Sequence, residues 1–375
     1  MNHKQLLSTL LLSVLATAAR AQTETAAAKD TACCEGCGCG CGTPAGVMSD
    51  HVHPAGGWMA GYRFMYQNLD GNRSGTRSTG IHDILDMDGF TSAPKSMDMK
   101  MHMFELMYAP TDRLTLMAMT AYNQMDMEMV MEASAMDHHD HGAAAPASAH
   151  AHALKHAGED HGGEEMETMT HSHSTEGWGD TSVSALVEVW SADDANLVAG
   201  LGVGLPTAKV DVKRDGKFTH YGMQLGRGTW DALPSLTLNK ALLGGSVGVQ
   251  ASGVFALEDK NDSGFRFGDI AALNLWHARP LAGPVSVSGR LGFTHQGEIE
   301  GHYNGAHNHA TPPDLQANYG GEILEAGLGF GLALPSGQCC AHRIAVEGVV
   351  PLHQDLNGVQ LERDLTLNVA WQASF

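Results

Sequence analysis

The sequence predicts an all-β protein, an antiparallel transmembrane β-barrel of about twelve strands, and three observations support this prediction. Residues 1–21 carry Lys4, an apolar stretch and an Ala-Arg-Ala site, which is the pattern of a secretory signal peptide. Apolar and polar residues then alternate in many separate segments, as in strands that turn one face toward lipid. The last of these segments ends on Phe375, as the terminal strand of many outer-membrane barrels does.

Twelve segments alternate in this way, an even number, as bacterial single-chain barrels require. They lie at 58–67, 99–108, 113–125, 181–190, 195–205, 233–241, 246–257, 265–276, 284–297, 322–333, 342–352 and 363–375. Long connections follow most odd-numbered segments and short ones follow most even-numbered segments, which is the habit of barrels with long external loops and short periplasmic turns. We therefore expect the outer membrane of a Gram-negative bacterium, with the N- and C-termini in the periplasm.

The chain divides into three parts around this barrel. The signal peptide is followed by a Cys-, Gly- and Ala-rich segment, 22–50, which we expect to be a mobile periplasmic arm. The barrel itself takes up 51–375. Within it, residues 133–177 are rich in His among Ala, Gly, Asp and Glu, and their low apolar content predicts a disordered external loop.

Methionines recur at every second residue in the first three predicted strands. A period of two places side chains on one face of a strand, here the face that also carries Arg63, Glu105 and Asn123. The opposite face carries Trp, Tyr, Phe and Leu, as a lipid-facing side should. Thioethers suit Cu(I) and Ag(I), yet methionine also fills gaps or lines a path for apolar solutes, so both interpretations stay open. The metal-binding hypothesis includes Met97, Met99, Met101, Met103, Met117, Met119, Met125, Met127, Met129 and Met131.

Histidines gather in the predicted external loop. Two short motifs, at His138, His139 and His141 and at His171 and His173, place imidazoles one or two residues apart. Such pairs bring two rings within reach of one Cu(II), Zn(II) or Ni(II) ion in a flexible chain. We expect a weak, multi-site metal-binding loop, with an inert polar loop as the alternative.

Cysteines form a third cluster. Five thiols occupy nine residues, at Cys33, Cys34, Cys37, Cys39 and Cys41. A further pair, Cys339–Cys340, falls in a predicted periplasmic turn. Seven is an odd number, and close neighbours are awkward to pair locally, so both disulfides and a Cu(I) or Zn(II) thiolate site remain open.

Several segments resemble a known family. GLGVGLPT at Gly200–Thr207, MQLGRGTWD at Met223–Asp231 and VPLHQDLNGVQL at Val350–Leu361 are similar to outer-membrane transporter barrels of the phenol meta-pathway (MetA-pathway of phenol degradation) type. The segments Gly46–Arg73 and Met99–Met119 resemble a Met- and His-rich branch of that family. The resemblance implies a transport barrel and, from the family's name, hydrophobic aromatic cargo.

Composition and motifs restrict the function further. The formal net charge of −20 argues against a nucleic-acid partner and is compatible with attracting cations. The chain lacks an H-E-x-x-H helix and a phosphate loop, so we expect no enzyme. The expected partners are outer-membrane lipid, metal ions or a small hydrophobic solute, and periplasmic metal-carrying proteins.

The sequence therefore predicts a porin-like transporter that binds or passes copper, as Cu(I) or Cu(II), through a Met-lined lumen. In this hypothesis external His residues hold Cu(II), lumen Met residues pass Cu(I), and the periplasmic Cys residues accept or deliver it. Two alternatives are a channel for small hydrophobic or aromatic compounds and a surface metal-sequestering protein anchored by its barrel.

Overall fold

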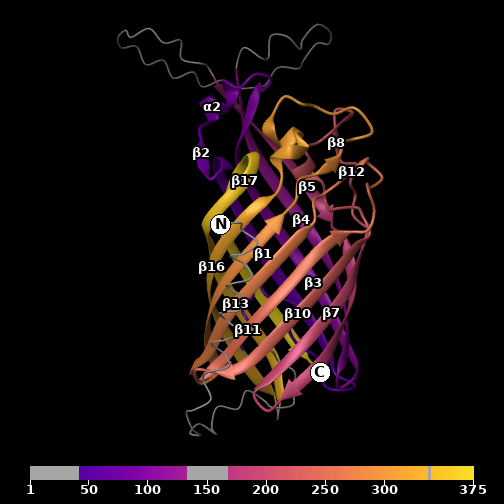
Figure 1. The fold of residues 1–375 in the computed structure, drawn as a ribbon, viewed down its shortest axis with the longest axis vertical. Helices are drawn as coiled ribbons and strands as arrows, with labels where there is room; N and C mark the ends of the chain where they lie inside the picture. The colour runs from indigo at the N-terminus through magenta and orange to yellow at the C-terminus, as the bar shows by residue number, and fades with distance from the viewer. Residues whose placement is uncertain (1–41, 133–167, 337–338) are drawn as a thin grey trace, which may run out of the picture. The chain divides into compact units, whose positions relative to one another are not determined.

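The computed structural model describes residues 42–132, 168–336 and 339–375, and these contain a closed antiparallel barrel (Figure 1). Each wall strand pairs with its neighbours along the chain, and β17 returns to pair with β1, which closes the sheet. The wall strands are β1 (Trp58–Gly75), β3 (Ser92–Thr111), β4 (Leu114–Glu132), β6 (Thr181–Ala192), β7 (Ala195–Leu205), β10 (Asp231–Leu242), β11 (Gly245–Ala256), β13 (Ile270–Ala282), β14 (Val285–Gln296), β16 (Gly321–Ser336) and β17 (Cys339–Ser374). The prediction of an antiparallel barrel is confirmed.

The long strand β17 accounts for two crossings of the wall. Its first half pairs with β16 and its second half with β1, and the direction reverses near Gly358, whose φ of 54° is the left-handed region that glycine adopts without strain. Eleven named strands therefore supply about twelve crossings, as the alternation predicts. The predicted connection at 353–362 is instead mostly strand, because both halves find backbone partners there.

The two faces of the wall follow the alternation in the sequence. Outward positions expose large apolar side chains, as with Leu201 at 65% and Phe330 at 61%. Inward positions of the final crossing, Thr366 and Asn368, are buried instead. Because alternate residues of a strand point to opposite faces, the barrel has an apolar exterior and a mixed interior.

One end of the barrel, which we call the turn end, has short hairpins such as the one between β3 and β4. The opposite end, the loop end, carries the long connections and several short elements. These are β2 (Arg77–Thr79), α2 (Ile81–Leu85), β5 (Thr168–Trp178), β8 (Lys213–Arg214), β9 (Lys217–Phe218), η2 (Tyr221–Met223), β12 (Phe265–Arg266), β15 (Glu300–Gly301), η3 (Pro312–Asp314) and η4 (Gln316–Asn318). In the described part of the chain, no helix has the length and apolarity needed to cross a membrane.

Strand β5 corrects the prediction of a disordered loop over 133–177. Residues 133–167 lie outside the described residues, but Thr168–Gly177 belong to β5 and pair with the upper half of β4. Because β6 pairs only with Leu114–Met119, the rest of β4 would otherwise present unpaired backbone groups. Strand β5, whose middle consists of Thr, His and Ser residues, supplies the missing backbone partner.

Aromatic side chains pack together among the connections at the loop end. Tyr303 stacks on Tyr221 and on Phe218, with ring centroids 4.3 Å and 4.2 Å apart. Phe265 lies edge-on to both tyrosines. Burial raises the pKa of Tyr303 well above its usual range, so the hydroxyl stays protonated and donates a hydrogen bond to the carbonyl of Thr219. This cluster fixes the long connections to one another.

Residues 42–57, which we call the plug, lie inside the turn-end half of the barrel. Their backbone carbonyls accept hydrogen bonds from inward side chains of three separate strands: Gln250 bonds Met48, Asn239 bonds Asp50, and Arg63 bonds Val47. The prediction of a mobile arm over 22–50 is therefore wrong for 42–50, because lumen side chains satisfy the backbone groups of this segment. Residues 22–41 lie outside the described residues.

Candidate functional site

Thirteen methionines share the inward face of three neighbouring strands, and we call this surface the methionine side. They are Met59, Met65, Met97, Met99, Met101, Met103, Met107, Met117, Met119, Met125, Met127, Met129 and Met131. All occupy odd positions, and eight of them are buried, whereas the even-numbered Phe104, Leu106 and Leu116 are exposed on the outer face. The prediction that the methionines face the lumen is confirmed.

Strand pairing lines these side chains up in rows. Met59 pairs with Met107, which in turn pairs with Met117. Residues directly opposite on neighbouring strands have Cβ atoms about 4.5–5.5 Å apart, so each row brings thioethers together across two or three strands. Two further rows nearer the loop end pair Met97 with Met127 and Met99 with Met125.

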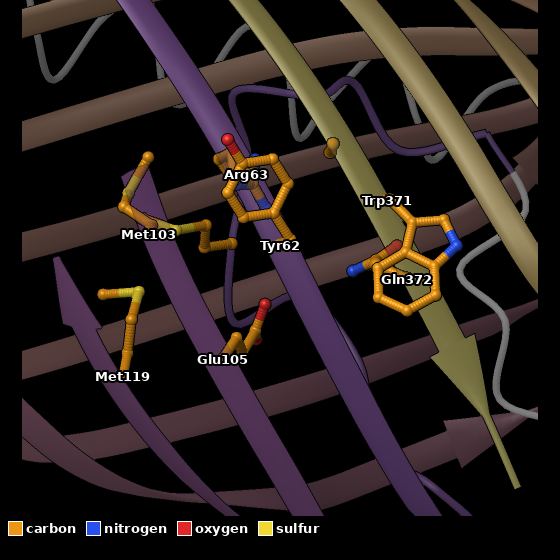
Figure 2. Close-up of a pocket in the computed structure, with 9 residues that line it drawn as sticks. Tyr62, Arg63, Met103, Glu105, Met119, Trp371 and Gln372 are labelled. Carbon is orange, nitrogen blue, oxygen red and sulfur yellow. The ribbon is translucent and has the colours of Figure 1, made fainter. Parts of the chain in front are cut away.

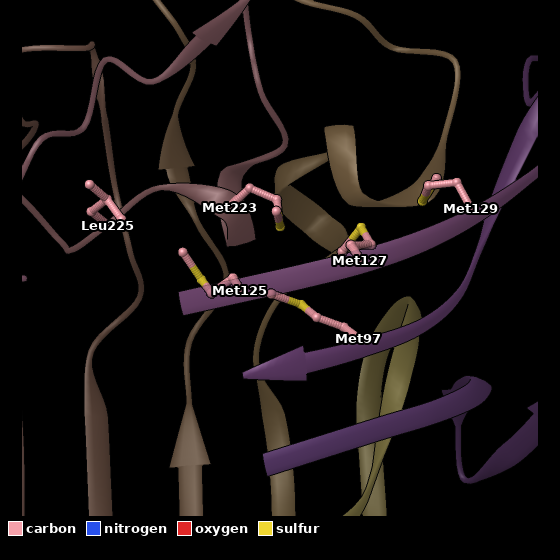
Figure 3. Packing of buried hydrophobic residues seen from close by; sticks show 6 residues of the cluster. All are labelled: Met97, Met125, Met127, Met129, Met223 and Leu225. Carbon is pink, nitrogen blue, oxygen red and sulfur yellow. The ribbon is translucent and has the colours of Figure 1, made fainter. Parts of the chain in front are cut away.

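The rows nearest the loop end form a compact apolar cluster (Figure 3). Met97, Met125, Met127 and Met129 pack with Met223 of η2 and with Leu225. The amide of Asn123 on β4 donates a hydrogen bond to the carbonyl of Leu225 at 2.8 Å. This connection between β7 and β10 therefore enters the barrel and covers the cluster from the loop end.

Two of the predicted histidines lie beside this cluster. On β5, His171 pairs with Met129 and His173 pairs with Met127. The ring of His173 also lies 4.8 Å from that of His171 and 5.4 Å from that of His220. The structure therefore brings three imidazoles to the edge of the methionine side.

Burial and the charges of neighbouring groups keep His173 neutral. Burial, followed by the charges of His220, His171 and Arg214, lowers the pKa of His173 to about 4. Its Nδ1 lies 2.8 Å from Nη1 of Arg214, so the guanidinium donates to the imidazole. A neutral ring can act as a ligand, but the adjacent guanidinium repels a cation, so this cluster is a weak metal site at most.

Buried charged and amide side chains occupy much of the lumen wall on β10 to β17, and we call this surface the polar side. Arg290 Nε donates to Glu347 Oε1 at 2.7 Å, and Arg290 Nη1 donates to Glu325 Oε1 at 3.0 Å. Arg363 completes the chain of ion pairs through the other oxygen of Glu325. The side chain of Glu347 is fully buried, so its charge depends on these partners.

The plug joins the two sides. The backbone N–H of Gly46 donates to Glu347 Oε2 at 2.7 Å, and a Cβ at Gly46 would lie only 2.6 Å from that oxygen. On the opposite side, Ser49 Oγ contacts Met117 Sδ at 3.8 Å and the N–H of His53 donates to Thr115 Oγ1. The lumen is thus closed at its turn-end half by backbone that both sides hold.

A small cavity lies where the plug meets the methionine side (Figure 2). Its volume is about 10 Å³, room for about one water molecule, and three thioethers from three different elements border it. Met48 comes from the plug, Met103 from β3 and Met119 from β4, with Glu105 and Arg63 beside them. Three methionines, one carboxylate and one guanidinium therefore border a space the size of a single small guest.

Three titratable groups stand next to each other in the plug. Burial alone would raise the pKa of Asp50, but His51 and the Thr43 hydroxyl lower it well below its usual range. Burial alone would lower the pKa of His51, but the Asp50 carboxylate raises it overall. Burial and the nearby His51 lower the pKa of His53 to about 4. Asp50 and His51 thus form an ion pair, and His53 is neutral.

Other predicted ligands are not placed. Cys33, Cys34, Cys37, Cys39, Cys41, His138, His139 and His141 lie outside the described residues. Cys339 and Cys340 begin β17, opposite Ser336 and Pro335, but only their backbone is described. Among the described residues, no group of three or more His, Cys, Asp or Glu side chains is arranged to hold a metal ion.

Sequence reasoning missed the plug and the polar side. Nothing in the composition of 42–57 distinguishes a lumen plug from a free arm, because its hydrogen-bond partners are up to 301 residues away. Arg290 and Glu347 gave a usable signal, since charged residues at alternate positions of a barrel strand must face the lumen. Met48 stands apart from the other methionines in the sequence, so the sequence did not group it with the methionine side.

Comparison with solved structures gives the fold a precedent. An outer membrane channel from Pseudomonas putida F1 is similar, with a TM-score of 0.54 and 13% identity over 86% of this chain and 97% of that one. A FadL homologue from Pseudomonas aeruginosa gives a TM-score of 0.37 and 10% identity over 84% and 89% of the two chains. No curated protein matches the sequence.

A family model provides the assignment. It matches residues 138–336, which is more than half of the chain, and it includes the segments Gly200–Thr207 and Met223–Asp231 on which the sequence resemblance rests. The barrel architecture agrees with that resemblance. The chain therefore belongs to the family described as "Putative MetA-pathway of phenol degradation".

Proposed function

We propose that this protein is an outer-membrane channel whose methionine side binds soft monovalent metal ions, Cu(I) or Ag(I). One observation carries the proposal. On β1, β3 and β4 every methionine faces inward, while the outer face of the same strands uses Leu, Phe, Tyr, Trp and Ala. Apolarity alone would distribute Met and Leu over both faces. Segregation of sulfur to the lumen supports a role for the thioether itself.

The polar side supports the same proposal. A passage for apolar solutes is expected to be lined mainly by apolar groups. Here the methionine side faces ion pairs such as Arg290–Glu347 and buried amides such as Gln250. A cation that exchanges its ligands among weak neighbouring sites can move along one wall of such a lumen, which a multi-site pathway requires.

The cavity at Met48, Met103 and Met119 is the favoured binding position. Trigonal sulfur coordination suits Cu(I), and these three thioethers come from the plug and from two wall strands. An ion bound there would contact the plug as well as the wall strands β3 and β4. In this proposal His171 and His173 bind copper weakly at the loop end. The cysteines before residue 42 exchange copper with periplasmic carriers.

The test is Cu(I) binding by purified protein in detergent, measured by competition with a chromogenic chelator. Replacing both Met103 and Met119 by Leu preserves volume and apolarity but removes sulfur. We expect at least a tenfold loss of affinity at the tightest site. A matched control replaces Met87, which is exposed outside the methionine side, by Leu. Equal affinities for wild type and the Met103/Met119 variant would contradict the proposal.

A second candidate, a channel for small hydrophobic or aromatic compounds, has its own support. The cluster of Met97, Met125, Met127 and Met129 is fully apolar, and the description of the family refers to phenol degradation. The Met103→Leu and Met119→Leu changes leave the methionine side apolar. Under this alternative, uptake of a phenol by proteoliposomes would persist in the Leu variant, and wild type would bind no Cu(I) above background.

A further inference from the structure

We propose that His51 and His53 of the plug form a transition-metal site of the borderline type, for which Zn(II) is the probe. The rings of His51 and His53 lie in edge contact, with centroids 4.9 Å apart and planes at 72°. His53 is 2% exposed, and the side chain of His51 is 13% exposed. Within the described residues, neither Nε2 atom has a hydrogen-bond partner, although both are buried.

The hydrogen bond of His51 orients it as a ligand. Its Nδ1 lies 2.9 Å from Oδ1 of Asp50, and because a carboxylate only accepts, Nδ1 donates. Because the ion pair keeps His51 protonated, an incoming metal ion must displace the Nε2 proton, and the lone pair then resides on Nε2, the atom that lacks a partner. A carboxylate that fixes the far nitrogen of an imidazole is the usual support of a metal-bound histidine. Thr43 in turn donates to the other oxygen of Asp50 at 2.5 Å.

The spacing of the rings fits a single ion. An ion about 2.0–2.1 Å from each Nε2 lies roughly 3.2 Å from each ring centre, and a tetrahedral angle then separates the two centres by roughly 5 Å. The observed 4.9 Å agrees with this value. Two imidazoles would leave further coordination positions for water.

Hydrogen bonds from the wall strands fix the plug on both sides of the His51 and His53 rings. The backbone N–H of His53 donates to Thr115 Oγ1 at 2.9 Å, and the carbonyl of Asp50 accepts from Asn239 at 3.0 Å. Because the ion binds only when both rings are in this place, it would stabilise the closed lumen relative to any state in which the plug has left.

This site is independent of the proposed function. Zn(II) prefers imidazole, thiolate and carboxylate ligands, whereas the methionine side offers thioethers. Failure of one proposal therefore leaves the other intact. The Met103→Leu and Met119→Leu changes should lower Cu(I) affinity and leave Zn(II) binding at the plug unchanged.

The experiment measures Zn(II) bound by full-length protein after equilibrium dialysis against a metal buffer that holds free Zn(II) in the micromolar range. We expect wild type to retain one Zn(II) per chain more than the His51→Gln/His53→Gln variant. The matched control is His295→Gln, whose side chain is 54% exposed on the barrel. This control should retain as much Zn(II) as wild type. Equal retention by wild type and the double variant would overturn the proposal.

A second measurement covers the case in which the double variant does not fold. X-ray absorption at the zinc edge of the dialysed wild-type protein should show two imidazole ligands. A spectrum without imidazole, or no retained Zn(II) at all, would overturn the proposal without any variant. Each single variant, which keeps the backbone hydrogen bond of residue 53 to Thr115, should lose this Zn(II) ion as well.

Discussion

The methionine side and the polar side line the same lumen but reach stability by different means. The methionine side packs flexible thioethers into apolar clusters around Met107 and Met129. The polar side neutralises buried charges with directed hydrogen bonds, as between Arg290 and Glu347. Packing of methionine tolerates changes of shape, whereas a buried ion pair tolerates loss of neither partner. The first kind of wall can admit a guest, and the second kind holds the plug in place.

The largest effect is expected on the polar side, at Glu347→Leu. This change removes a carboxylate that receives hydrogen bonds from both Arg290 and the plug at Gly46. Leaving the guanidinium with Glu325 and Asn274 alone should destabilise the barrel by about 3–5 kcal/mol. This loss is measured as the change in the free energy of unfolding by urea in detergent. Glu322→Gln, at a half-exposed carboxylate, is the control and should change little. A loss below about 1 kcal/mol would show that the lumen solvates these charges.

A smaller effect is expected on the methionine side, at Met129→Ala. The side chain is 1% exposed, so truncation leaves a cavity, but flexible neighbours fill part of it. We expect a loss of about 2–3 kcal/mol for Ala and less than about 1.5 kcal/mol for Leu, by the same unfolding assay. An equal loss of stability for Leu and Ala would contradict the claim that the methionine side tolerates changes of shape.

The smallest effect is a pH dependence at the loop-end edge of the methionine side. The folded protein keeps His173 neutral down to about pH 4, while a histidine in the unfolded chain binds its proton near pH 6.5. Unfolding therefore takes up a proton between these values, and stability should fall as the pH drops from 7 toward 4. Urea midpoints measured at several pH values should fall less steeply for His173→Gln than for wild type. Parallel curves would mean that His173 is protonated in the folded barrel.

The predictable part of the fold is the part that repeats along the chain. All twelve predicted segments contain or overlap a wall crossing, although the one expected at 265–276 begins later, at Ile270. The odd-numbered methionines face the lumen because strand periodicity is a local property. The plug was not predictable in the same way, since the partners of Gly46 and Asp50 are Glu347 and Asn239, far away in sequence. Strand β5 was missed because it forms only where β4 extends beyond β6.

By itself the sequence determined the barrel, the two faces of each strand and the segregation of methionine to the inner face. Each of these follows from a period of two and from the burial preference of apolar side chains. Only the tertiary structure decided that residues 42–57 close the lumen, that Met48 joins Met103 and Met119, and that two imidazoles of the plug meet with unpartnered nitrogens. The physical reason is closure of the barrel, which brings β1 against β17. The closed wall then surrounds the plug and supplies hydrogen-bond partners for its backbone that lie far away in the sequence.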